Sequence, residues 1–180
     1  MKRTLLAVLC FMLMACSACF AETVYLGSPE DLDTSTIEVQ TTNDKDYNHY
    51  VNKRYGFAID VPAAVTLAQE TSTNDGCTFM DTADDSTFVI YGAENLMKMS
   101  LNELFNVDMV SNMNPTPTYK QFGPNWYAVA WEKGKKTYYK KVVVFGQYYN
   151  SFAVTYPTAK QDKYMAIIRH MNGTFAPAFK

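Results

Sequence analysis

Three long stretches rich in aromatic and β-branched residues lie close together in the second half of the chain. They cover residues 125–132, 137–145 and 148–156, and only four and two residues separate them. Both connections contain a glycine. Connections this short join antiparallel strands, because a parallel crossover needs a dozen residues or more. These residues therefore predict two consecutive antiparallel hairpins.

Shorter strands and two helices are predicted around these hairpins. Short alternating or apolar runs predict four further strands, at residues 57–61, 65–68, 77–80 and 88–91. Ser100 and Glu103 form a capping box that begins one helix, and Thr158 and Gln161 form another. The order of strands, helix, strands and helix predicts an α+β domain, with a central antiparallel sheet and helices packed on it.

The chain begins with the layout of a secretory signal. Lys2 and Arg3 precede an apolar run at residues 4–15, which is too short for a comfortable permanent membrane span. Small residues then lead to Ala21. The pattern predicts a signal peptide over residues 1–21 and an exported protein that is periplasmic or extracellular.

A second processing site competes with cleavage after Ala21. Residues 13–16 read LMAC and resemble a bacterial lipobox, in which Cys16 is lipidated and becomes the first mature residue. Lipidation would make the protein a membrane-anchored lipoprotein. The small residues just before Glu22 favour simple cleavage, which leaves Glu22 as the first residue.

An acidic segment follows the signal, over residues 22–49. It contains seven acidic residues against the single Lys45, and no apolar periodicity continues through it. Such a segment is predicted to be a flexible tether, because it cannot bury enough apolar surface to offset its ordering entropy. Ile37 and Val39 are the two residues within it that could lie against the domain. Residues 50–180 are expected to form one domain.

Composition and motifs argue against most kinds of chemistry. Without residues 1–21 the chain keeps 14 basic and 18 acidic residues, so a general nucleic-acid binder is not expected. Cys77 is then the one cysteine and has no base beside it, and His49 and His170 are the two histidines. The sequence has no hydrolase, zinc, dithiol or phosphate-loop motif, so we expect no catalysis, no cofactor and no metal.

The stretch around Gly56 resembles a known family. Its residues Tyr50, Asn52, Tyr55-Gly56-Phe57, Ile59 and Pro62 are similar to the first strand of small secreted bacterial proteins with the Mog1/PsbP-like fold. The order of the later elements is also similar, so the resemblance covers about residues 50–179. It implies an α/β/α sandwich and an accessory role. The family includes an accessory photosystem subunit and a nuclear protein that binds a small GTPase.

The sequence thus predicts an exported, non-catalytic binding or accessory module. Its partner would be an unknown envelope component or another protein. One alternative is a hydrolase whose site is assembled from distant residues such as Asp81, Asp84 or His170. A purely structural envelope protein is a second alternative.

Five residues are the candidates for a binding surface: Lys133, Lys135, Lys136, Trp126 and Trp131. The three lysines would gather at the tip of the first hairpin and attract an anionic lipid headgroup, polysaccharide or acidic protein surface. The two indole rings would add an aromatic surface. A hairpin tip that is merely solvated also explains the lysines. Strand alternation places Lys140 and Lys141 on opposite faces, so they cannot both join this tip.

Overall fold

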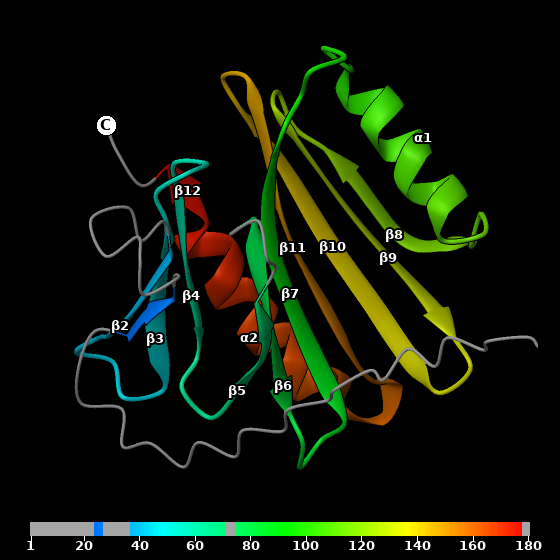
Figure 1. The fold of residues 1–180 in the computed structure, drawn as a ribbon. Coiled ribbons are helices and arrows are strands. Elements are labelled where there is room, and N and C mark those ends of the chain that lie inside the picture. Colours follow the sequence, from blue (N-terminus) through cyan, green and yellow to red (C-terminus); the bar gives the residue numbers. More distant parts are fainter. Residues whose placement is uncertain (1–23, 27–36, 71–74, 178–180) are drawn as a thin grey trace, which may run out of the picture.

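The computed structural model of this chain describes residues 24–26, 37–70 and 75–177. These residues form two antiparallel sheets, two α-helices and a short 3-10 helix. Figure 1 shows how the sheets and the α-helices are arranged in space. The predicted α+β class is confirmed, although the structure has two sheets where the sequence predicts one. The predicted signal peptide, residues 1–21, lies outside the described residues.

The larger sheet has seven strands and forms the centre of the fold. In spatial order they are β5 (Thr66–Glu70), β6 (Gly76–Asp81), β7 (Ser86–Glu94), β11 (Tyr148–Pro157), β10 (Lys136–Phe145), β9 (Trp126–Lys133) and β8 (Pro117–Phe122). The two predicted hairpins are confirmed as β9–β10 and β10–β11. Their turns contain Gly134 and Gly146, with φ of 65° and 59°. Strand β8 was not predicted, because it begins with a proline and all its side chains are exposed.

The smaller sheet has five strands. In spatial order they are β1 (Val24–Leu26), β2 (Ile37–Thr41), β3 (Tyr47–Asn52), β4 (Phe57–Pro62) and β12 (Ala176–Pro177). The prediction of a flexible tether up to residue 49 is therefore wrong for residues 37–49. Strand β2 pairs with β3, and this pairing buries Ile37 fully and leaves Val39 only 8% exposed. The acidic composition of this segment argued against a buried strand. Glu38 is nevertheless buried, because its carboxylate forms an ion pair with the ammonium group of Lys53.

The two faces of the larger sheet have different covers (Figure 1). Helix α2 (Gln161–Thr174) and the smaller sheet cover one face, where a single core cluster joins Phe57, Phe152 and Tyr164. Helix α1 (Leu101–Ser111) covers the other face, where Leu104 packs over Tyr127. Successive residues of β9 and β10 therefore enter different cores, because strand side chains alternate between faces.

Of the two capping boxes predicted at the starts of the helices, the structure contains one. Ser100 accepts a hydrogen bond from the Glu103 amide, and the Glu103 carboxylate accepts one from the Ser100 amide, so the first capping box is confirmed. The second is wrong. Thr158 lies in the 3-10 helix at Thr158–Lys160, and its hydroxyl is 2.9 Å from that of Thr137. The Thr158 hydroxyl therefore hydrogen-bonds to a neighbouring strand and does not cap α2.

The stretch around Gly56 is structural, as predicted. Gly56 has a φ of 66° and turns the chain between β3 and β4. A residue with a side chain would be strained in this conformation. Tyr50, Phe57 and Ile59 on either side of the turn are fully buried. The apolar side chains of this stretch therefore belong to the core of the domain, and the stretch is not a binding motif.

Candidate functional site

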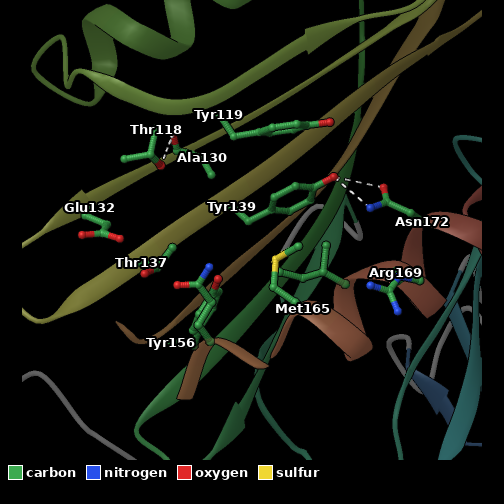
Figure 2. A pocket seen from close by; sticks show the side chains of 12 residues that line it. Thr118, Tyr119, Ala130, Glu132, Thr137, Tyr139, Tyr156, Met165, Arg169 and Asn172 are labelled. Carbon is green, nitrogen blue, oxygen red and sulfur yellow. Dashed lines mark hydrogen bonds between the residues drawn. The ribbon is translucent and has the colours of Figure 1, made fainter. Parts of the chain in front are cut away.

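A pocket of about 440 Å³ lies between α2 and the larger sheet (Figure 2). Its volume falls in the range of roughly 300–1,000 Å³ that is typical of small-molecule sites. The residues that line it are Thr118, Tyr119, Ala130, Glu132, Thr137, Tyr139, Tyr156, Gln161, Met165, Ile168, Arg169 and Asn172. Strands β8 to β11 provide one wall and α2 provides the other.

The spacing of the lining residues follows from the elements that carry them. Side chains two apart share a face of a strand, which brings Ala130 and Glu132 of β9 to the pocket together. Side chains three or four apart share a face of a helix. The helix contributes residues at this spacing: Gln161, Met165, Ile168, Arg169 and Asn172. The pocket therefore runs along α2 from its first residue into its last turn.

The middle of the pocket is apolar and aromatic. Tyr139 and Tyr156 are 8% and 2% exposed, whereas Met165 is 42% exposed. The Tyr139 hydroxyl and the Asn172 side-chain amide exchange hydrogen bonds, with N–O and O–O distances of 2.9 and 3.1 Å. This contact joins β10 to α2 and fixes the Tyr139 ring. A ligand would meet a rigid aromatic wall and one flexible thioether.

The two buried phenols stay neutral at physiological pH. Burial raises the pKa of Tyr139 to about 12, against the opposing effect of its bond with Asn172. Burial is also the main cause that raises the pKa of Tyr156, and the Glu132 carboxylate adds to it. Both side chains can therefore donate hydrogen bonds or pack against a ligand, but they are unsuited to act as bases.

Two charged side chains lie on the pocket, Glu132 and Arg169, and both are exposed. Within the described part of the chain, neither forms a hydrogen bond or an ion pair. Glu132 stands opposite Thr137 in the β9–β10 pair, and Thr137 meets Thr158 just before α2. Glu132 therefore lies where the helix begins, whereas Arg169 lies in its second half (Figure 2).

The lysine tip predicted from the sequence lies outside this pocket. Lys133 and Lys135 are exposed at the β9–β10 turn, whereas Lys136 binds Asp85 with an Nζ–Oδ2 distance of 2.8 Å. Lys133 and Lys136 pair across the hairpin, next to Glu132 on the strand. Alternation places them on the opposite face of the sheet from Glu132 and the pocket. Binding of an anionic partner at this tip stays a prediction.

Lys140 and Lys141 lie on opposite faces of the larger sheet, as predicted. Lys140 faces α1, where its Nζ is 2.6 Å from Oδ1 of Asp108. Lys141 faces the other way, with its ammonium 5.0 Å from the centre of the Trp126 ring. Neither lysine joins the tip.

The two tryptophans do not share a surface. Trp126 is half-buried beneath Lys141, on the face that α2 covers. Trp131 is 5% exposed and stacks on Tyr138 in the core beneath α1, with ring centres 5.4 Å apart. The structure therefore gives Trp131 a packing role and does not present its ring to a partner.

Asp81 and Asp84, two candidates for a hydrolytic site, are held by lysines. Asp84 is largely buried and forms ion pairs with Lys160 and Lys163, and it also accepts a hydrogen bond from the Tyr164 hydroxyl at 3.1 Å. Asp81 shares Lys163 at 3.2 Å. Hydrogen bonds from Lys160 and Lys163 hold the pKa of Asp84 well below its usual range. The cluster anchors the start of α2 to the β6–β7 turn.

This anchor should make the stability of the protein sensitive to acid. The pKa of Asp84 is lower in the folded protein than in the unfolded chain, where it is about 3.9. The ionised carboxylate therefore stabilises the fold above this pH, and this stabilisation is lost as the pH falls below it. The melting temperature of the wild type should fall between pH 5 and pH 2. In Asp84→Asn the melting temperature should fall less over this range, because asparagine has no carboxylate to protonate. Parallel melting curves for the two proteins would contradict this role for Asp84.

The two histidines, His49 and His170, both contact the carboxylate of Asp60, outside the pocket. His49 Nδ1 is 2.7 Å from Oδ1 of Asp60, and His170 Nε2 is 2.9 Å from Oδ2. Tyr47 stacks on His170 with ring centres 3.6 Å apart. This group links β3 and β4 to α2, and none of its members lines the pocket. The structure thus does not bring His170 together with Asp81 and Asp84.

The described residues contain no group of three or more histidine, cysteine, aspartate or glutamate side chains placed to hold a metal ion. None of the helices described in the structure has the length and apolar character needed to cross a bilayer.

None of the pocket residues was predicted from the sequence to form a binding site. The available signal was the pair Met165 and Arg169, which lie four residues apart and outside the apolar stripe of Tyr164, Ile168 and Met171. A methionine and a cation beside a core stripe indicate a second, partly apolar face of the helix. Which strands oppose that face depends on the tertiary structure.

Comparisons with known proteins agree with the fold. No family model and no curated protein matches the sequence. Among solved structures, the solution structure of cyanobacterial PsbP (CyanoP) from Synechocystis sp. PCC 6803 is similar, with a TM-score of 0.57 and 10% sequence identity. The match covers 77% of this chain and 97% of the PsbP chain. The resemblance seen around Gly56 is thereby confirmed at the level of the fold, and this chain has a PsbP-like fold.

Proposed function

We propose that this protein is an exported, non-catalytic binding module, and that its ligand or partner occupies the pocket between α2 and the larger sheet. The observation that carries the proposal is the pocket itself. It combines a volume of about 440 Å³ and a buried aromatic wall with a few polar groups along α2. Concave, mainly apolar sites with a few polar groups are typical of ligand binding.

The composition of the pocket favours binding over catalysis. Its two buried phenols, Tyr139 and Tyr156, are neutral, and Glu132 is the only carboxylate among its described lining residues. General acid–base chemistry needs a positioned group whose pKa lies near the working pH, or a nucleophile beside a base. The residues of the rival hydrolase, Asp84 and His170, belong to two structural clusters at different ends of α2. A hydrolytic site assembled from them has no support in this geometry.

The fold is consistent with an accessory role. The Mog1/PsbP-like proteins that the sequence resembles include an accessory photosystem subunit, and the similar solved structure is a cyanobacterial PsbP. Fold alone does not determine function, so the pocket remains the main support for the proposal. The partner would be an envelope component or another exported protein.

The proposed role of the pocket predicts a loss of binding when the pocket is filled. Met165→Trp adds an indole ring to the pocket, and Met97→Trp makes the same change on the β7–α1 connection, where Met97 is 80% exposed. Tagged wild type and both variants would be incubated with native envelope extract. We expect Met97→Trp to recover the same partner as the wild type and Met165→Trp to recover at least tenfold less. Equal recovery by both variants would refute the pocket as the binding site.

Export predicts a specific mature terminus. We expect the protein recovered from its native envelope to begin at Glu22, because small residues precede the cleavage site after Ala21. Intact-mass spectrometry gives the answer directly. A mass that corresponds to a lipidated chain beginning at Cys16 would mean that the module is membrane-anchored, and an unprocessed chain would mean that it is not exported.

A further inference from the structure

The charges of the pocket suggest which class of ligand it takes. Glu132 and Arg169 lie at different ends, and each lacks an ion-pair partner among the described residues. Other acidic side chains of the domain, such as Asp84 and Asp108, are paired with lysines. Two unpaired charges of opposite sign on one pocket would complement a ligand that has a cation at one end and an anion at the other.

The part of α2 that lies between these charges sets the length of the ligand. Glu132 pairs with Thr137, which contacts Thr158 just before α2, and Arg169 is the eighth residue after Gln161, the first residue of the helix. At a rise of about 1.5 Å per residue, this distance is about 12 Å along the helix axis. An extended peptide spans about 3.3–3.6 Å per residue, so three residues cover roughly 10 Å. The flexible side chains of Glu132 and Arg169 can make up the difference.

The space between the charges suits a peptide. Tyr139, Tyr156 and Met165 offer apolar contacts to its side chains. Gln161 and Asn172 carry side-chain amides, which can donate to and accept from peptide groups. A guanidinium group binds a carboxylate through two parallel hydrogen bonds, which gives Arg169 a natural role at a free carboxyl terminus.

We propose that the pocket binds a free, apolar peptide of about three residues, with its amino terminus at Glu132 and its carboxyl terminus at Arg169. The inference rests on the proposed function, because it takes the pocket to be the binding site. It adds the ligand class and the direction in which the ligand lies along α2.

Trileucine and its blocked forms test the inference on the full mature chain. The probes are free trileucine, its N-acetyl form, its C-terminal amide and the doubly blocked peptide, titrated by calorimetry and by NMR. We expect free trileucine to bind most tightly and each single block to weaken binding at least tenfold. Arg169→Gln should abolish the difference between the free peptide and the amide. Glu132→Gln should abolish the difference between the free and acetylated peptides.

A matched control separates local from general charge effects. Asp162 is an exposed carboxylate in the first turn of α2 that does not line the pocket, so Asp162→Asn should bind all four probes as the wild type does. Equal binding of all four probes, or no binding of trileucine at millimolar concentration, would overturn the peptide inference. The pocket as a binding site would survive this result, because the recovery of a partner by Met165→Trp tests it separately.

Discussion

Phe57→Ala should lower the free energy of unfolding by about 3–5 kcal/mol, the range for truncating a buried phenylalanine. Phe57 is fully buried at the start of β4, in the core that both sheets share. Its ring centre lies 5.9 Å from that of Tyr50 and 5.6 Å from that of Phe175. The substitution therefore leaves a cavity between the two remaining rings, Tyr50 of β3 and Phe175, the residue that follows α2.

This loss is large in comparison with the total free energy of unfolding. Domains of this size are stable by only about 5–15 kcal/mol, so this one change removes a substantial share of the stability. Chemical denaturation monitored by circular dichroism measures it. Val110→Ala, on the exposed face of α1, is the control and should change the unfolding free energy by less than about 0.5 kcal/mol. Equal effects of the two substitutions would show that Phe57 does not belong to the core.

Lys140→Met should cost about 3 kcal/mol of unfolding free energy, near the lower end for breaking a buried ion pair. The Lys140 and Asp108 side chains are 12% and 16% exposed, and the pair ties β10 to α1. Burial lowers the pKa of Lys140, but Tyr91 and Asp108 outweigh it and raise the pKa overall. Without the ammonium group, Asp108 keeps the Tyr127 hydroxyl as a donor but loses its cation.

The next residue provides a control of the same chemistry. Lys141→Met removes an ammonium group that rests over the Trp126 ring, and burial alone lowers the pKa of Lys141. Methionine keeps much of the packing of the stem, so the cost should be below about 1 kcal/mol, the typical size of an exposed cation–π contact. Two denaturation curves compare the variants. A Lys141→Met protein less stable than Lys140→Met would mean that the two side chains are assigned to the wrong faces.

Local patterns in the sequence predicted much of the larger sheet. The β9–β10 and β10–β11 hairpins follow from three long strand-like stretches and two short connections that contain glycine, and the capping box at Ser100 marks the start of α1. Both signals are local, because they depend on residues a few positions apart. The capping box at Thr158 misled for the opposite reason, since a threonine on a neighbouring strand competes for the same hydroxyl.

The smaller sheet and the pocket could not be predicted in this way. Strand β2 is short and carries Glu38, whose charge is balanced by Lys53, fifteen residues later in the chain. The pocket depends on which face of α2 meets β8 to β11, and strand β8 has no buried side chain to reveal it. The lysines attracted interest because they are adjacent in sequence, whereas Glu132 and Arg169 share the pocket from distant positions.

A photo-crosslinking experiment tests the central claim, that ligand or partner occupies the pocket, most directly. A diazirine amino acid close to methionine in size would replace Met165 in the pocket or, in a second protein, Met97 on the β7–α1 connection. Both proteins would be illuminated in the native envelope and analysed by intact mass and gel mobility. We expect a discrete adduct from position 165 and none from position 97. An adduct from position 97 with none from position 165 would contradict the claim.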